Sequence, residues 1–232
     1  MIRVIAIDGP AASGKSSTAA AVARRLGWAH LDSGALYRAV TLAVLDNLRD
    51  AGRGMRDAWP PQQVVALAED LPVRLVLVGD AFRPTVAGVD VEETIRSERV
   101  TRHVSAIAAI REVRNWVNVQ QRGAVAGVPG GVVVDGRDIG TVVFPDAPVK
   151  VFLTASAEER ARRRLAQRGS RIDPAELARE AQALAARDDA DSTRPVAPLR
   201  AAADAVRLDT TDLSLAQQAD RVVALARERL PG

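Results

Sequence analysis

Residues 9–16 constrain this chain more than any other stretch. They read Gly-Pro-Ala-Ala-Ser-Gly-Lys-Ser and match the phosphate-loop pattern G-x-x-x-x-G-K-[ST] at every fixed position. Glycines in such a loop let successive backbone N–H groups point at phosphate oxygens, while Lys15 reaches the β- and γ-phosphates and Ser16 offers a hydroxyl to Mg²⁺. We expect a nucleoside triphosphate to bind here, through Gly9, Pro10, Ala11, Ala12, Ser13, Gly14, Lys15, Ser16 and Ser17.

The sequence on either side of the loop agrees with this interpretation. Residues 2–7 form a short apolar run typical of a buried parallel strand, and residues 16–26 are rich in alanine, with Val22 and Leu26 at helical spacing. Gly27 ends the predicted helix. A glycine turn without a ligand would not require Gly-Lys-Ser at its helix entry, so phosphate binding is the favoured interpretation.

The composition sets limits on the class of protein. A chain of 232 residues can bury the core of one sizeable α/β domain, and no apolar run approaches the roughly 20 residues of a membrane span. Because the chain begins with a strand rather than a signal segment, we expect a cytoplasmic protein without a membrane partner. The absence of cysteine excludes disulfides and thiol catalysis, and His30 and His103 are predicted to be packed or solvated rather than ligands.

The charge pattern argues against a nucleic-acid partner. Arginine makes up 30 of the 32 basic residues, but the net charge is only +3, and the arginine runs at 160–171 and 187–200 are interleaved with acids. Aromatic residues are only 3% of the chain, which leaves few side chains for stacking on single-stranded bases. We therefore expect no nucleic acid to bind.

Polar residues follow two further predicted strands. The strand at 28–31 leads to Asp32, Ser33 and, one turn into the next helix, Arg38. Ligands of open α/β sheets bind beyond the carboxyl ends of the strands, so these residues are candidates for a site beside the phosphate loop. Ser33 could equally act as the cap of the following helix, and the sequence leaves both roles open.

The run Gly-Val-Val-Val at 131–134 ends in Asp135 and resembles a Walker B strand, whose carboxylate helps to hold Mg²⁺, usually through water. Motor ATPases usually place a glutamate after that aspartate, but Gly136 and Arg137 follow here. The sequence therefore favours phosphate transfer to an acceptor over hydrolysis. It also contains no Asn-Lys-x-Asp stretch for reading guanine, which argues against a GTP switch.

The remaining segments complete a predicted P-loop α/β fold, with a parallel sheet flanked by helices. Residues 50–63 are predicted to form a connection, residues from about 64–97 a small antiparallel β insertion, and residues 98–123 helical segments. A helical flap is expected at about 156–174, within a single domain that spans 1–232.

The predicted flap carries many arginines. Arg160, Arg164 and Arg168 share one helix face, and ordinary pairing with Glu158 and Glu159 would account for such a run. Phosphoryl transfer also needs positive charge over the transferring group. We therefore expect at least one of the flap arginines Arg160, Arg162, Arg163, Arg164 and Arg168 to contact phosphate, with Arg164 as the catalytic candidate.

Four stretches carry a resemblance to a known family: I-D-G-P-A-A-S-G-K-S, L-D-S-G-A-L-Y-R at 31–38, D-G-R-D-I-G-T-V-V-F-P-D-A at 135–147 and R-D-D-A-D-S-T-R-P-V-A-P at 187–198. In these, the chain resembles the bacterial cytidylate kinases of the nucleoside monophosphate kinase group, over nearly its full length. The resemblance implies transfer of the γ-phosphoryl group of ATP to CMP or dCMP with Mg²⁺, by a chain that we expect to be a monomer. It also implies that the β insertion serves the acceptor nucleotide.

The resemblance assigns roles to individual residues. It implies that Lys15, Arg137, Arg164 and Arg194 act in catalysis, and that Ser16 and Asp135 hold the metal. The implied acceptor residues are Ser33, Arg38 and Arg137 at the CMP phosphate, Arg194 at the phosphates from the other side, Arg187 and Asp191 at the sugar, and Ser105, Arg114 and Asp138 at the base. The alternatives are a kinase of another small acceptor and, less favoured, an RNA-binding ATPase.

Overall fold

The structure, a computed structural model, describes residues 3–48, 59–170 and 172–230. The chain divides into two compact units: one comprises Met1–His30 and Gly130–Gly232, and the other comprises Leu31–Pro129. Strand β2 (Ala29–Asp32) crosses the boundary between them. The predicted single domain over the whole chain stays a prediction.

The first unit is built on a parallel sheet. Its strands run in the order β6 (Gly131–Gly136), β1 (Arg3–Asp8), β7 (Val149–Thr154) and β8 (Val206–Asp209), and every neighbouring pair is parallel. β1 and β6 are buried along almost their whole length, as expected for central strands of a parallel sheet with continuous apolar runs. The carboxyl ends of β1 and β6 thereby bring the phosphate loop and the Asp135 segment to one edge of the sheet.

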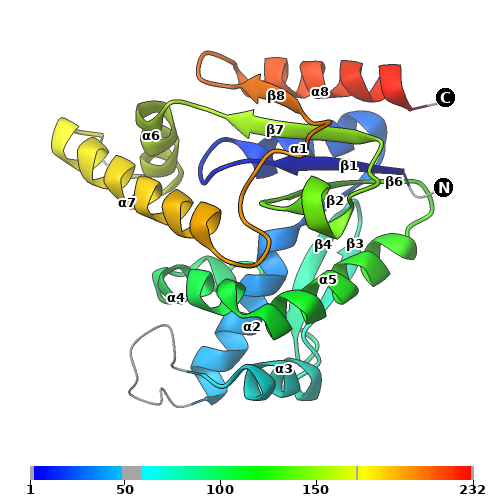
Figure 1. Cartoon of the computed structure of the whole chain (residues 1–232), viewed down its shortest axis with the longest axis vertical. Helices are drawn as coiled ribbons and strands as arrows, with labels where there is room; N and C mark the ends of the chain where they lie inside the picture. The colour runs from blue at the N-terminus through cyan, green and yellow to red at the C-terminus, as the bar shows by residue number, and fades with distance from the viewer. Residues whose placement is uncertain (1–2, 49–58, 171, 231–232) are drawn as a thin grey trace. The chain divides into compact units, whose positions relative to one another are not determined.

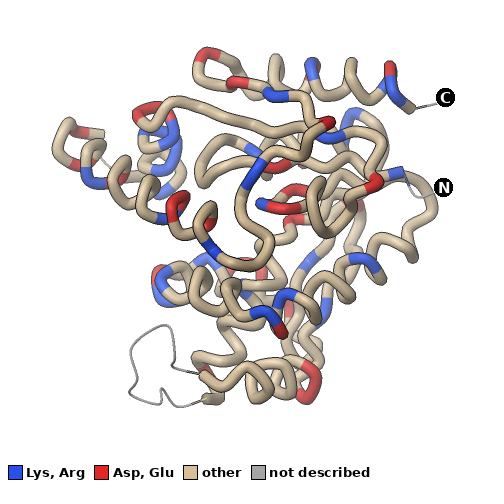
Figure 2. Tube along the Cα trace, viewed as in Figure 1, with Lys and Arg blue, Asp and Glu red and all other residues tan. Residues whose placement is uncertain are grey.

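Four helices complete this unit (Figure 1). Helix α1 (Lys15–Leu26) follows the phosphate loop and packs against α8 (Leu215–Arg229), with Val22, Val222 and the apolar side chains of β1 and β7 in the shared core. Helices α6 (Ala157–Gln167) and α7 (Pro174–Thr193) pack on each other; the acids of α6 lie in its first turn, ahead of its arginines, whereas residues of both charges occur along α7 (Figure 2). A short turn of π-helix, η2 (Ile139–Val143), follows β6.

The second unit combines an antiparallel hairpin with helices. Its core contains Leu36, Val40, Trp59, Ile95 and Ile107, all buried. Its elements are α2 (Ser33–Asn47), α3 (Pro61–Asp70), the antiparallel strands β3 (Arg74–Val78), β4 (Ala81–Val86) and β5 (Val89–Asp90), the 3₁₀ turn η1 (Thr94–Arg96), α4 (Glu98–Ala109) and α5 (Arg111–Ala126). The strands fall within the stretch where the sequence predicts a β insertion.

The structure differs from the sequence-based expectations at two helices. The helical stretch after residue 98 is interrupted at Ile110, whose extended backbone (φ −72°, ψ 121°) ends α4 and begins α5. At the end of the predicted flap, helix α7 begins at Pro174 and continues to Thr193, and so includes most of the charged stretch at 187–194. Residues 50–58 of the predicted connection and residue 171 of the predicted flap lie outside the described residues.

None of the described helices is long and apolar enough to cross a membrane.

Candidate active site

The backbone of the phosphate loop has the conformation that its glycines allow. Gly9 has φ 151°, and a Cβ atom there would lie 2.2 Å from the backbone oxygen of Leu153. Gly14 (φ 92°) is the N-cap of α1, and Ala12 also has a positive φ of 58°. The loop therefore ends at the N-terminus of a twelve-residue helix, where backbone N–H groups and the helix dipole favour an anion.

Lys15 lies within the loop rather than in solvent. Its Nζ donates to the carbonyl oxygen of Pro10 at 2.6 Å and lies 3.5 Å from Ser13 Oγ, and only 6% of the residue is exposed. Burial, reinforced by the charge of Arg137, lowers the pKa of Lys15 well below its ordinary value. A phosphate at the loop would counter both effects and favour the ammonium form.

Ser16 and Asp135 meet as the Walker patterns predict. Ser16 Oγ donates to Asp135 Oδ2 at 2.6 Å, and His30 Nε2 lies 2.7 Å from Asp135 Oδ1. Burial opposes ionisation of Asp135, but the hydrogen bonds and charges of its neighbours outweigh it, so its pKa lies below the ordinary value. His30, for which the sequence indicates no ligand role, thus packs against the predicted metal-site carboxylate.

Asp8, at the end of β1, anchors the turn that follows β6. Its two carboxylate oxygens accept the backbone N–H groups of Ile139 and Gly140, each at 2.8 Å, and only 3% of the residue is exposed. Burial raises the pKa of Asp8 to about 6, although the two N–H donors oppose the shift. This carboxylate therefore holds the segment that carries Arg137 and Asp138.

Five charged residues form what we call the charged cluster: Arg137, Asp138, Arg187, Asp191 and Arg194. Arg137 Nε donates to Asp191 Oδ2 at 3.0 Å, while Arg194 lies 3.6 Å from both Asp138 Oδ1 and Asp191 Oδ1. Burial, and then the charge of Arg137, lowers the pKa of Arg187 to about 10, so its guanidinium remains protonated at neutral pH. The structure thus brings together the acceptor residues predicted near 137 and near 190.

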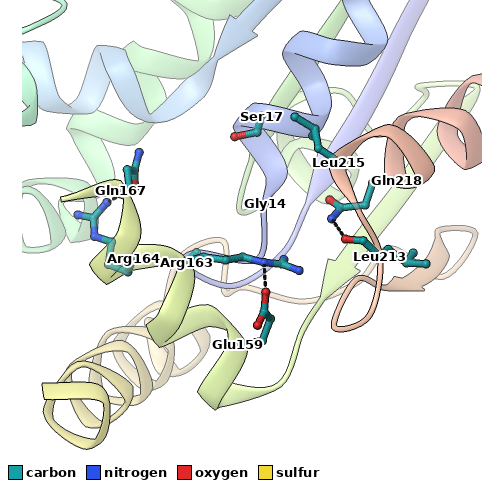
Figure 3. Close-up of a pocket in the computed structure, with 10 residues that line it drawn as sticks. Gly14, Ser17, Glu159, Arg163, Arg164, Gln167, Leu213, Leu215 and Gln218 are labelled. Carbon is teal, nitrogen blue, oxygen red and sulfur yellow. Dashed lines mark hydrogen bonds and ion pairs between the residues drawn. The ribbon is translucent and has the colours of Figure 1, made fainter. Parts of the chain in front are cut away.

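A cavity of about 340 Å³ lies beside the phosphate loop (Figure 3). Leu213 and Leu215 supply apolar walls, and Arg163 supplies a guanidinium that is held by Glu159 Oε1 at 2.9 Å. The other lining residues are Ala12, Gly14, Ser17, Arg164, Gln167 and Gln218. Its volume lies in the range of small-molecule sites, and its lining mixes apolar surface with a few directed polar groups.

The three arginines predicted to share a face of α6 have different surroundings. Arg160 is buried and donates to the carbonyl oxygen of Ala11, and Arg168 pairs with Glu180 on α7 at 2.9 Å. Arg164 donates to Gln167 at 3.0 Å and lines the cavity. Of the three, Arg164 therefore remains the candidate for contact with phosphate.

In the second unit, Ser33 does not cap α2. The N-cap is Asp32, whose carboxylate accepts the N–H of Gly34 at 2.9 Å, so the capping role that the sequence left open belongs to Asp32. The Ser33 hydroxyl and carbonyl instead accept from Gln121 Nε2 at 3.1 and 3.2 Å. Arg38 donates to the Ile95 carbonyl and to a threonine hydroxyl on α4.

The two residues of this unit that the resemblance assigns to the base lie on α4 and α5. Arg114 is 2% exposed, donates to the carbonyl of Ala108 at 3.0 Å and stacks over the Tyr37 ring at 5.3 Å. Ser105 is partly exposed on α4. The structure describes these residues within their own unit, and their predicted role at the base stays a prediction.

Sequence reasoning missed several residues that shape the site. Asp8, Arg163 and Asp188 all lie within or next to the patterns that it used, and a search for acids at strand ends would have found Asp8. Gln121 is fully buried within α5 and gave no local signal, because its partner Ser33 is 88 positions away.

Comparison with known proteins agrees with the geometry of this site. The model of the cytidylate kinase family, described as "Cytidylate kinase", matches residues 5–228. The chain is 48% identical to a cytidylate kinase of Mycobacterium avium, over 97% of this chain and 96% of that one. It is 45% identical to one of Streptomyces griseus (96% and 91%) and 44% identical to one of Pseudomonas fluorescens (95% and 93%). The chain therefore belongs to the cytidylate kinase family.

Proposed function

We propose that this kinase transfers the γ-phosphoryl group of ATP to CMP or dCMP, giving ADP and CDP or dCDP. The observation that carries the proposal is the charged cluster in the same folded unit as a complete phosphate loop. The cluster contains three guanidinium groups and two carboxylates, so it has one positive charge in excess for an anionic acceptor. Family membership supports the same reaction.

The donor is ATP, with its phosphates on the loop from Gly9 to Ser17. The buried ammonium of Lys15 and the N–H groups at the start of α1 supply positive potential for the β- and γ-phosphates. We assign the adjacent cavity to the adenosine moiety, because Leu213 and Leu215 offer apolar contact and the Arg163 guanidinium can stack on a base.

Ser16 and Asp135 fit a role in holding Mg²⁺. One hydroxyl and one buried carboxylate, 2.6 Å apart, are the oxygen donors that Mg²⁺ takes together with water and substrate phosphates. The ion, when bound, would neutralise charge on the β- and γ-phosphate oxygens. The depressed pKa of Asp135 keeps the carboxylate ionised for this purpose at neutral pH.

The acceptor assignments follow the family pattern at matched positions. Arg137 and Arg194, which contact carboxylates of the charged cluster, would bind the phosphates, and Arg187 and Asp191 would contact the sugar. The Arg187 Nε is buried and has no hydrogen-bond partner among the described residues, which leaves a donor for a ligand. In the second unit, the family pattern assigns Ser33 and Arg38 to the CMP phosphate, and Ser105 and Arg114 to the base.

The reaction needs no protein base. A monophosphate is largely dianionic near neutral pH, since its second pKa is about 6, so an acceptor oxygen can attack the γ-phosphorus directly. The bond from that phosphorus to the β–γ bridging oxygen breaks, and the negative charge that develops there is met by Lys15 and by arginines such as Arg137 and Arg164. The residues thus act by positioning and by electrostatic stabilisation.

Base selection is proposed to rest on Asp138, and the family pattern also assigns Arg114 to the base. The cytosine N4 amino group is a donor that a carboxylate accepts, while N3 and O2 are acceptors that a guanidinium satisfies. Uracil presents a carbonyl at position 4, which would face Asp138 and cost several kcal/mol in a closed pocket.

The test is coupled ADP release with CMP, dCMP, UMP and AMP in turn, as initial rates at matched concentrations. We expect kcat/KM to be highest for CMP or dCMP and about 10-fold or more lower for UMP. A higher value for AMP, or for a non-nucleotide acceptor such as shikimate, would assign the chain to another small-acceptor kinase. Hydrolysis stimulated by RNA and falling steeply with salt would instead support the RNA-binding ATPase.

We also propose that the enzyme acts as a monomer. Sedimentation equilibrium at assay concentrations would test this, and a stable dimer would overturn it.

A further inference from the structure

Both backbone polar groups of Ala11, in the middle of the phosphate loop, are bound by side chains of the α6–α7 pair. The N–H of Ala11 donates to Asp188 Oδ1 at 2.9 Å, and its carbonyl oxygen accepts from Arg160 Nη1 at 3.2 Å. Arg160 Nη1 also pairs with Asp188 Oδ2, so one guanidinium and one carboxylate enclose the peptide groups of a single residue.

This contact is buried. Ala11 and Arg160 are 4% and 9% exposed, and Ala11 packs in a small apolar cluster with Ala161 of α6 and Leu184 of α7. Charged hydrogen bonds in such surroundings are screened little by solvent, and breaking one partner of a buried pair is costly.

Asp188 lies within the part of α7 that carries acceptor residues. Arg187 precedes it directly, Asp191 lies about one turn further on and binds Arg137, and Arg194 is the C-cap of the helix. The hydrogen bond between Asp188 and Ala11 therefore fixes the position of these groups relative to the phosphate loop.

We infer that Asp188 and Arg160 form a clasp that positions the acceptor-binding end of α7 on the donor loop. Both clasp residues are positioning residues, since the N–H and C=O of Ala11 occupy them. The inference rests on the proposed function for the roles of Arg187, Asp191 and Arg194. Its consequence is that a residue bonded to the ATP loop controls affinity for the acceptor.

Loss of the clasp should affect the acceptor more than the donor. The loop is also held at Ser13, whose carbonyl accepts from Thr210 Oγ1 at 3.1 Å and from Arg163 Nη1 at 3.4 Å. The positive φ angles of Gly9 and Gly14 do not depend on the clasp, so we expect the loop to keep its backbone conformation when the clasp is lost. The contacts of Asp188 and Arg160 with Ala11 are direct links from the α6–α7 pair to the loop, so their loss releases chiefly the α7 end.

The experiment compares Asp188→Asn, Arg160→Met and the double variant with Asp189→Asn. The control removes the same charge one residue further on, at an exposed position. KM and kcat are measured separately for CMP and for ATP, and calorimetry measures CMP binding without ATP. We expect each clasp variant to raise KM for CMP about 10-fold and KM for ATP less than about 3-fold, because displaced positioning groups typically cost 10- to 100-fold.

The double variant tests whether the two residues act as one unit. The KM of the double variant for CMP should equal that of the more impaired single variant, because the effects of two residues in one network do not add. Arg160→Lys, which keeps the charge but loses the forked geometry, should fall between wild type and Arg160→Met. If Arg160→Met does not fold, Asp188→Asn and Arg160→Lys carry the same comparison.

The inference is overturned if the folded clasp variants keep the wild-type KM for CMP, if their effects multiply in the double variant, or if Asp189→Asn behaves like them. Failure of the proposed function has a different signature, because wild-type enzyme would then show no transfer to CMP and no heat of CMP binding.

Discussion

The phosphate loop and the charged cluster are built in opposite ways. The loop presents backbone groups, and the positive φ angles of Gly9 and Gly14 give it its curvature. The cluster presents side chains from two segments about fifty residues apart, and its geometry comes from ion pairs such as Arg137 with Asp191. We therefore expect the loop to lose its function when its backbone conformation is disturbed. We expect the charged cluster to lose its function when one of its charges is removed.

The difference also separates recognition of the two substrates. Phosphate is common to all nucleotides and can be bound by backbone N–H groups, which any suitable loop supplies. An acceptor nucleotide has to be distinguished from its relatives, and this requires side-chain donors and acceptors in fixed positions. The variants below test the contrast, from the largest expected effect to the smallest.

Lys15→Ala should reduce kcat by about 10³-fold or more, equivalent to about 4 kcal/mol of transition-state stabilisation, because it removes the buried amine that we propose to contact the β- and γ-phosphates. Coupled ADP release measures the rate, and circular dichroism confirms folding. A folded variant with wild-type turnover would remove Lys15 from the mechanism.

Gly9→Ala should destabilise the fold by about 3–5 kcal/mol, because the new Cβ would meet the backbone oxygen of Leu153 at 2.2 Å and φ is 151°. Gly27→Ala is the matched control: φ is also positive, at 65°, but no atom lies within 4 Å, so about 1 kcal/mol is expected. Urea unfolding measures both. Equal effects would show that steric contact at Gly9 does not restrict the loop.

Asp8 should link stability to pH. Its folded pKa of about 6 lies above the ordinary value of 3.8, so the native state binds the proton more tightly, and the stability that this contributes is present below about pH 4 and lost as pH rises through 6. The unfolding free energy of wild type minus that of Asp8→Asn should therefore fall between pH 4 and 7, by about 3 kcal/mol at most. A difference that is flat with pH would contradict the assignment.

Asp138→Ala should reduce the preference for CMP over UMP by about 10-fold, because it removes the carboxylate proposed to accept the N4 amino group. Asp146→Ala, at an exposed position a few residues away, should leave the kcat/KM ratio unchanged. An unchanged ratio in Asp138→Ala would end the base-reading assignment.

Much of the parallel-sheet unit could be predicted, because its signals are local. The continuous apolar run of 131–134 implies a buried strand, and Gly-Lys-Ser marks a helix entry. The break at Ile110 could not be predicted, because the apolar residues of α4 and α5 have similar helical spacing. The end of α4 and the start of α5 depend on how the two helices pack in the second unit. The burial of Arg160 could not be predicted either, because an arginine on a charged helix face is expected to be exposed to solvent unless its partners are known.

The sequence by itself predicted phosphate binding at residues 9–16 and indicated which family the chain resembles, because the fixed spacing of glycine, lysine and serine is a local signal. Only the tertiary structure decided which charges are paired. Arg160 meets Asp188 and Ala11, and Asp8 holds the turn after Asp138, across 28 to 177 positions of chain. Burial of those groups lowers the screening of their charges, so the same residues that look interchangeable in sequence have different roles in the folded enzyme.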